Sequence, residues 1–381
     1  MLAFSAVLML VRPFGIPYWA GPALGVVIAL ATTQVGIGDA WESLSPLHEP
    51  LLFLVFAVPL AVTLDDLGLF EALTARVDGG RHLIAWMWVL AAAVVIVFNL
   101  DAAVVLLTPL YIRVAQRHGH PAEALAFQPA LLACLASSLL PVSNLTNLIA
   151  AEQLDLGIDD FVRHMAVPTV VACTVGYVAY RRTFAFPDRP APAPEPVDQR
   201  ALRLGLPIVA FLLVGFTIGD AAEVPAWVVA AIATTWAAAL SRRVRWRTVP
   251  VGAIVVAACL AVLVAAALPH LNLDAIFDRP DGSGRLAALL YGVVGSNATN
   301  NLPAILAGTP SIVNDDQTWP LLIGTNLGPV LVLTASLSSL LWKDTAKRIG
   351  VDISGARYSA IGIRVGLPAL VAAAAVVIAM P

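Results

Sequence analysis

The sequence is poor in charge, and this scarcity decides its class. Only 12% of the 381 residues are Asp, Glu, Lys or Arg, and 59% are hydrophobic. Soluble domains carry roughly 25% charged residues. A chain this apolar would not stay dispersed in water, so we expect a membrane protein.

Other scarcities exclude further classes. The net charge is −3, and no basic patch with interleaved aromatics indicates nucleic acid binding. The chain holds no catalytic triad, metal-binding His/Glu pair or phosphate loop, so we expect neither an enzyme nor a cofactor. The three cysteines, Cys134, Cys173 and Cys259, are far apart and form no disulfide framework or metal motif. We interpret them as packing residues; thiolate ligation of a soft metalloid would require them to converge in space.

Apolar segments of membrane length run along the whole chain, but several are too short to cross a bilayer. Segments 83–98 and 102–114 are separated only by Asn99-Leu100-Asp101, which leaves no room for a solvent loop. They predict a re-entrant hairpin, 83–114, with its tip inside the membrane. The first span is short before Arg12-Pro13, so either the native start lies upstream or the first helix is stunted.

A polar motif occurs in both halves of the chain. Asn99-Leu-Asp-Ala-Ala-Val-Val-Leu-Leu-Thr-Pro109 is matched by Asn300-Asn-Leu-Pro-Ala-Ile-Leu-Ala-Gly-Thr-Pro310. A second polar break follows each copy, at Leu139–Leu145 and at Leu321–Leu327. Paired, interrupted apolar segments are typical of secondary transporters, where they surround a binding site near the bilayer midplane.

The placement of positive charge predicts the topology. If both ends of hairpin 83–114 lie in the cytoplasm, all Arg and Lys residues except Arg163, Arg279 and Arg285 fall on or near that side. The second hairpin, 286–313, then enters from the opposite face, which implies an inverted repeat.

The predicted fold is therefore an all-α polytopic membrane protein with two inverted repeats, in the plasma or inner membrane. Each repeat has a re-entrant hairpin and an unwound transmembrane helix. The N-terminal half, 1–180, contains broken helix 126–150, and the C-terminal half, 204–381, contains broken helix 319–342. Between them, residues 181–203 form a Pro-rich cytoplasmic linker.

The chemistry is expected at the hairpin tips and helix breaks, because polar groups in hydrocarbon are costly unless they face protein or a cavity. Asp101 is an acidic residue between two apolar arms, and we interpret it as a proton carrier or cation ligand. Its alternative role is to cap the second arm through the amides of residues 102–104. The predicted substrate- or ion-binding residues are Asn99, Asp101, Ser143, Asn144, Thr146, Asn147, Ser296, Asn297, Thr299, Asn300, Asn301, Thr325 and Asn326.

These neutral amides and hydroxyls suit a small hydroxylated solute or a partly dehydrated cation. Alternatively, they form interhelical hydrogen bonds that hold broken helices together. No Arg or Lys lies at the tips, which counts modestly against an organic anion. Trp319 and Trp342 lie near span ends and are interpreted as interfacial anchors.

Four colinear motifs resemble the arsenical pump membrane proteins, the arsenite and antimonite efflux permeases of the ion transporter superfamily. They are Phe98–Leu110, Leu140–Leu148, Ser296–Pro303, and Asn326–Pro329 followed by Ser336–Trp342. The resemblance implies export of trivalent arsenite or antimonite as the neutral trihydroxide. It also implies drive by the proton motive force or help from a soluble pump ATPase, with Asp101 coupling protons.

The chain departs from the pattern of that family at three positions. Leu100 stands where the family commonly has Asn, and Asn326 replaces a common acidic residue before Leu-Gly-Pro. Val330 replaces a lysine that usually follows. The loss of one acid and one base keeps the local charge balanced, but leaves Asp101 without a second carboxylate for proton exchange.

These observations leave three alternative functions. The first is a metalloid exporter that works by alternating access. The second is a sodium- or proton-coupled carboxylate or anion transporter of the same superfamily. The third is a membrane protein without transport activity, such as a scaffold or a membrane-embedded enzyme.

Overall fold

The structure is a computed structural model that describes residues 2–11, 16–75, 82–187, 196–243, 245–279 and 281–380. Within these ranges the chain is helical, with no β-strand. Five of the described helices are long and apolar enough to cross a membrane. The prediction of an all-α polytopic protein is confirmed.

The first half contains short helices, two helices joined at Asn99, and a helix interrupted by an irregular segment. Its elements are α1 (Leu2–Val11), α2 (Ala20–Ala31), α3 (Ile37–Glu42), α4 (His48–Asp66), α5 (Leu69–Ala75), α6 (Leu83–Phe98), α7 (Leu100–Arg117), α8 (Ala122–Leu135), η3 (Pro141–Ser143), α9 (Leu145–Leu154) and α10 (Ile158–Thr183). Part of the linker predicted at 181–203, residues 188–195, lies outside the described residues.

The second half follows a similar order. Its elements are α11 (Gln199–Ala221), α12 (Ala226–Ser241), α13 (Val251–Ala267), α14 (Asp274–Phe277), α15 (Asp281–Ala298), α16 (Asn301–Gly308), α17 (Thr318–Leu327), η8 (Gly328–Val330), η9 (Leu333–Ala335), α18 (Leu337–Arg348), α19 (Gly355–Ile361) and α20 (Leu367–Ala379). A π-helical turn at Gly362–Gly366 joins the last two.

Helices α6 and α7 form an antiparallel hairpin. A single residue, Asn99, separates them, and its positive φ of 84° turns the chain sharply. The hydroxyl of Tyr111 on α7 donates to the carbonyl of Met87 on α6. These two residues lie equally far along the chain from Asn99, so the two arms run back along each other as predicted for 83–114.

Helices α15 and α16 form the corresponding hairpin, with Asn300 (φ 145°) at its tip. The Tyr291 hydroxyl on α15 donates to the Ala304 carbonyl on α16 at 3.2 Å. Both tips therefore use an asparagine with positive φ, which is uncommon outside glycine. The repeated motif thus corresponds to the same local geometry.

Each half also contains an interrupted helix. Helices α8 and α9 flank residues 136–144, which form turns, a bend and a 3₁₀ turn, and α17 and α18 flank residues 328–336. The second break lies later than predicted, because Leu321–Leu327 remains helical. The helix ends where Pro329, which lacks a backbone N–H, follows Gly328.

Trp342 corrects another prediction. It is not an interfacial anchor: its side chain is buried, and its indole N–H donates to the Ala126 carbonyl at 2.7 Å. The position of a tryptophan near the end of an apolar run did not reveal that α18 packs inside the protein.

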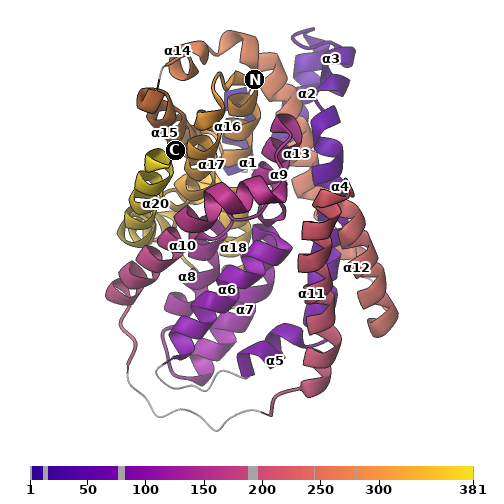
Figure 1. Ribbon diagram of the computed structural model, residues 1–381, viewed down its shortest axis with the longest axis vertical. Coiled ribbons are helices and arrows are strands. Elements are labelled where there is room, and N and C mark those ends of the chain that lie inside the picture. The colour runs from indigo at the N-terminus through magenta and orange to yellow at the C-terminus, as the bar shows by residue number, and fades with distance from the viewer. Residues whose placement is uncertain are drawn as a thin grey trace.

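The two hairpins occupy opposite ends of the molecule. Helices α6 and α7 lie in its lower half, together with α5 and the start of α11, whereas α15 and α16 lie in its upper half (Figure 1). Their tips meet in the interior, because residues of both tips line one cavity. This arrangement has the opposite entry expected of inverted repeats, although the repeat symmetry itself stays a prediction.

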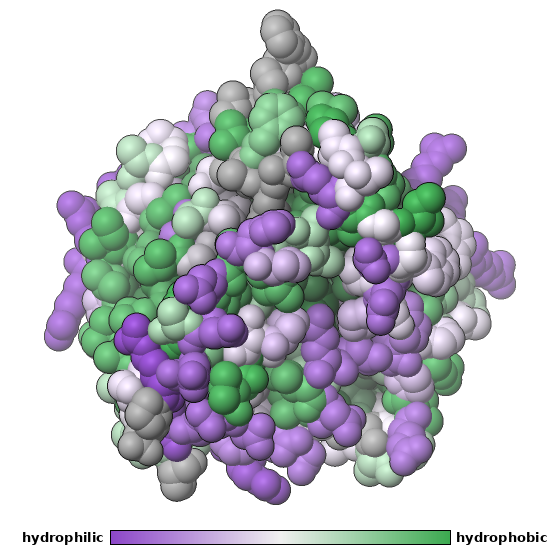
Figure 2. All heavy atoms as spheres, turned by 90° about the horizontal axis from the view of Figure 1, so that it is seen from above, coloured by the Kyte–Doolittle hydropathy of each residue, from purple (hydrophilic) through white to green (hydrophobic). Residues whose placement is uncertain are grey.

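The outer surface is apolar along the helices and more polar at the end. Exposed valines include Val27, Val170, Val294 and Val371 on α2, α10, α15 and α20. At the upper end, hydrophilic side chains gather over the middle and one edge (Figure 2). Widespread exposed apolar surface suits contact with lipid rather than water.

Candidate functional site

A small central cavity lies where the two hairpin tips meet the two helix breaks. It measures about 40 Å³ and is lined by residues of the N-terminal turns of α7, α9, α16 and α18, with apolar contributions from α1 and α13. A buried water needs roughly 10–15 Å³ of such space, so the cavity has room for a solute of a few heavy atoms. Its polar lining residues are Asp101, Asn144, Thr146, Asn300, Asn301, Ser336 and Ser338.

All four helices begin with a side-chain cap, which explains why they start at this place. The side-chain oxygen of Asn99 accepts from the Asp101 amide at 2.9 Å. Asn144 caps Thr146 and Asn300 caps Leu302, each at 3.2 Å. The fourth cap is Ser336, whose hydroxyl accepts from the Ser339 amide at 3.2 Å. Asparagine and serine are favoured at this position because they satisfy amides that lack helical partners.

The four helix starts make the cavity electropositive, since each helix carries about half a positive charge at its N-terminus. Asp101 supplies a carboxylate among them, in the first turn of α7. Its Oδ1 atom is buried and has no hydrogen-bond partner. Asn99 supplies the N-cap of α7, and no hydrogen bond between the Asp101 carboxylate and the amides of residues 102–104 is found among the described contacts. An ionised carboxylate in this position requires compensation by the helix ends, a proton or a bound solute.

Five predicted residues line the cavity, namely Asp101, Asn144, Thr146, Asn300 and Asn301. The others lie around it. Asn99 is a cap, and Ser143 donates to the Ile96 carbonyl of α6 at 2.8 Å. Ser296 is fully buried, and its hydroxyl has no partner.

The remaining predicted residues bond to the protein itself. Asn297 ties α15 to the second break by donating to the Gly328 carbonyl at 2.9 Å. Thr299 and Thr325 donate to carbonyls of their own helices. Asn147 and Asn326 bond to each other at 2.6 Å. The alternative prediction of interhelical bonding thus describes the contacts of Asn147, Asn297 and Asn326, whereas the Thr299 and Thr325 hydroxyls bond locally.

Ser336 and Ser338 were missed as site residues. Ser336 precedes a helical segment as a typical N-cap does, so its local role was visible in the sequence. Its position at the cavity was not, because that depends on where α18 starts relative to the hairpin tips. Met9 and Val256, which close the cavity from α1 and α13, gave no sequence signal.

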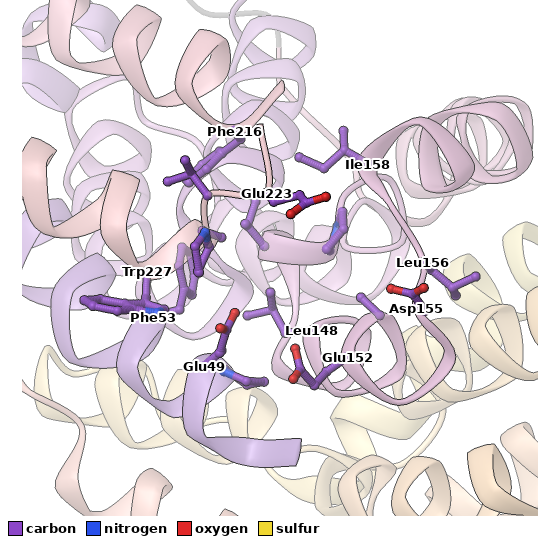
Figure 3. Close-up of a pocket in the computed structure, with 17 residues that line it drawn as sticks. Glu49, Phe53, Leu148, Glu152, Asp155, Leu156, Ile158, Phe216, Glu223 and Trp227 are labelled. Carbon is purple, nitrogen blue, oxygen red and sulfur yellow. The ribbon is translucent and has the colours of Figure 1, made fainter. Parts of the chain in front are cut away.

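A larger hollow of about 400 Å³ lies between α4, α9 and the junction of α11 and α12. It reaches Pro141 and Val142 in the first break. The carboxylates of Glu49, Glu152 and Glu223 are arranged around it (Figure 3). We call this hollow the acidic vestibule.

Glu152 lies beyond broken helix 126–150, at the wall of the acidic vestibule. Burial raises its pKa, the Glu49 and Asp155 carboxylates raise it further, and His48 opposes them. The vestibule thus gathers acidic groups close to the first break.

The described residues contain no group of three or more His, Cys, Asp or Glu side chains placed to hold a metal ion. Cys134 is buried on α8, and Cys173 and Cys259 are half-buried on α10 and α13. None of the three lines the central cavity.

The sequence profile of the citrate transporter family, CitMHS, matches residues 6–343. The chain belongs to this family. It is accordingly a multi-pass membrane protein of a transporter family, as the apolar helices and paired hairpins indicate.

The chain is also similar to proteins named arsenical pump membrane protein. The one from Escherichia coli (strain K12) is 27% identical over 97% of this chain and 95% of its own length, and the one from Yersinia enterocolitica is 26% identical over the same shares. The predicted resemblance is confirmed. A more limited match, 30% identical over 35% of this chain and 28% of the relative, is the silicon efflux transporter LSI3 of Oryza sativa subsp. japonica.

A solved structure shares the fold. The YdaH transporter of Alcanivorax borkumensis, described as having an unusual topology, matches with a TM-score of 0.65. The match covers 92% of this chain and 88% of that chain at 14% identity. At this identity the likeness concerns architecture alone.

Proposed function

We propose that this protein is a secondary active transporter that exports trivalent arsenite or antimonite from the cytoplasm by alternating access. The observation that carries the proposal is the central cavity. It combines neutral amides and hydroxyls with one carboxylate, and no Arg or Lys is among the described residues that line it. The arsenical pump relatives along nearly the whole chain support the same substrate.

The cavity chemistry suits a neutral trihydroxide. Hydroxyl groups both donate and accept, and the lining offers both partners in Asn144, Asn301 and Ser338. The volume of about 40 Å³ matches a compact solute better than a tricarboxylate. Citrate would also meet the Asp101 carboxylate without an arginine to receive its own charges.

Proton coupling is assigned to Asp101. Its buried Oδ1 atom has no hydrogen-bond partner and can either bind a proton or accept a hydrogen bond from a solute hydroxyl. Proton and solute therefore compete for the same atom. Protonation from the outer side would release the solute, and loss of the proton to the cytoplasm would reset the site. We assign the outer route to the acidic vestibule. In this proposal the linker and the ends of α6 and α7 lie in the cytoplasm, and the protein lies in the plasma or inner membrane. A soluble pump ATPase remains a further proposed partner.

The test measures arsenite accumulation in cells that lack their own exporters, at two external pH values. Protein-dependent loss of arsenite is expected, and Asp101→Asn is expected to abolish its pH dependence at normal protein abundance. Asp159→Asn is the matched control, because Asp159 is exposed on α10, where it pairs with Arg163. Full pH-dependent export by the Asp101→Asn variant would contradict the proposal that Asp101 couples transport to protons.

The family name supports a second candidate, a sodium- or proton-coupled carboxylate transporter. The four helix starts around the cavity also favour an anion. Citrate uptake in vesicles with a sodium or proton gradient tests it. Citrate uptake without arsenite export would replace the first proposal. Silicic acid belongs in the same assay, because the rice relative is named a silicon efflux transporter.

A further inference from the structure

Asn326 forms a buried bridge between the two halves of the chain. It lies near the end of α17 and is 2% exposed. Its side chain contacts Asn144, Thr146 and Asn147, all in the first turn of α9 or its cap. We call these four residues the amide bridge.

The backbone fixes the direction of every amide in the bridge. Asn147 Nδ2 donates to the carbonyls of Ser137 and Leu140, at 2.7 and 3.1 Å, and carbonyls can only accept. The Oδ1 atom of Asn147 is therefore free to accept from Asn326 Nδ2 at 2.6 Å.

The hydrogen bonds of Asn144 fix the orientation of the Asn326 side chain in the same way. Asn144 Oδ1 accepts from the Thr146 amide, so its Nδ2 group donates to Asn326 Oδ1. Thr146 Oγ1 donates to the same oxygen at 3.5 Å. Asn326 thus serves as an acceptor on one side and a donor on the other, which a neutral amide or a protonated carboxylic acid can do and an ionised carboxylate cannot.

The bridge reaches the cavity indirectly. Asn144 and Thr146 line the cavity, whereas Asn326 does not. On the other side, Asn147 holds carbonyls of the irregular segment between α8 and η3. A change at Asn326 would therefore alter the first broken helix without removing a cavity-lining group.

We infer that Asn326 is a positioning residue: it holds Asn144 and Thr146 in their cavity-facing orientation and ties the first break to the second half of the protein. It does not contact the solute. The orientation of Asn144 and Thr146, and the connection between the first break and the second half, are inferred from these hydrogen bonds alone. The expected effect on solute affinity rests on the proposed transport function.

Asp at position 326 makes a direct test, because its two protonation states differ in what they can do. A protonated carboxyl has one acceptor and one donor and reproduces the amide. An ionised carboxylate has only acceptors, faces Asn147 Oδ1, and is buried without a cation. Asn326→Asp should therefore keep the bridge at low pH and lose it at high pH.

Other ionisable groups must be separated from this effect. On helices packed against α17 they include Arg285 and Tyr291 on α15, Glu123 and Cys134 on α8, and Glu152 on α9. None of these hydrogen-bonds to Asn326 among the described contacts, and Asp101 shares the cavity with Asn144. Each variant is therefore compared with the wild type at the same pH, which cancels their titration.

The experiment uses the full chain purified in detergent and reconstituted in vesicles, at pH 5.5 and pH 8. The variants are Asn326→Asp and Asn326→Leu, which has no hydrogen bonds at either pH. The control is Thr235→Val, because the exposed Thr235 hydroxyl on α12 donates to the Ala231 carbonyl of its own helix at 2.8 Å, far from the amide bridge in the sequence and outside the cavity lining. Melting temperature and the apparent KM for arsenite are measured for each.

Asn326→Asp is expected to melt near the wild type at pH 5.5 and well below it at pH 8. Its apparent KM should equal that of the wild type at pH 5.5 and rise about 10-fold at pH 8, the effect of losing one buried hydrogen bond. Asn326→Leu should be impaired at both pH values, and Thr235→Val at neither.

Three results would overturn the inference. Wild-type melting and KM in Asn326→Leu would show that the bridge does nothing. A pH-dependent melting temperature with unchanged KM would reduce Asn326 to a structural residue. A folded Asn326→Asp that fails to bind arsenite at pH 5.5 would make Asn326 a ligand. If the wild type carries no arsenite, the proposed function fails, and the inference about the amide bridge is then tested by melting temperature alone. An Asn326→Asp variant whose melting temperature differs from that of the wild type by the same amount at both pH values would refute it.

Discussion

The contact between α15 and α17 is a place where a single added methyl group should destabilise the protein. A Cβ atom at Gly324 would lie 2.4 Å from the Leu289 carbonyl oxygen and 3.0 Å from Gly292 Cα. A Cβ atom at Gly292 would in turn lie 2.7 Å from the Leu321 oxygen. The two backbones therefore touch, as small residues permit in membrane helix pairs.

The expected cost of Gly324→Ala follows from this geometry. Ordinary contacts of a Cβ atom begin at 3.4 Å, so the helices would have to separate by about 1 Å. A gap of that size forfeits a quarter to a half of the dispersion energy along the interface, and overpacking typically costs about 1–3 kcal/mol. The shift would also move Asn326, which lies on the same helix.

The assay is the melting temperature of the purified protein in detergent, followed by transport. Gly324→Ala is expected to melt several degrees below the wild type. Gly38→Ala is the matched control, because no atom lies within 4 Å of its added Cβ atom on α3; alanine there should leave stability unchanged or raise it by ~0.5–1 kcal/mol. Equal melting of the two variants would refute the close-contact argument.

Two further variants test the hairpin tip and the acidic vestibule. Asn99→Ala should lower the free energy of unfolding by about 1 kcal/mol through loss of the α7 cap, whereas Asn99→Gly should lose only a few tenths because glycine suits the positive φ; the reverse order of melting temperatures would contradict this reading. Because the folded protein raises the pKa of Glu152, stability should fall as pH rises through its titration. Glu152→Gln should therefore raise the melting temperature at pH 8 and leave it unchanged at pH 4. The control is Glu42→Gln, at an exposed residue of α3 that does not line the acidic vestibule, and no difference between the two variants at pH 8 would argue against the charge cluster.

The sequence by itself determined the class of protein and most of its helices. Low charge and long apolar runs leave no alternative to a lipid environment, and this signal is local. Hairpin 83–114 was predictable because three residues cannot form a solvent loop. The repeated Asn motif located both tips, since an asparagine with positive φ starts α7 and α16 in the same way.

The tertiary structure decided which polar residues share the cavity. Caps at Asn99, Asn144, Asn300 and Ser336 look alike in the sequence. Their convergence depends on hairpins packing from opposite ends, which is a long-range property.

The assignment of Asn326 shows the same limit. Its residue type fits either a ligand or a bridge, and only its distance to Asn144 and Asn147, nearly half the chain away, separates the two. The prediction that Trp342 is an interfacial anchor was wrong for the same reason. Its burial depends on neighbours that are distant in the sequence. Apolar patterning fixes which segments enter the membrane, but packing between distant segments fixes which polar groups meet there.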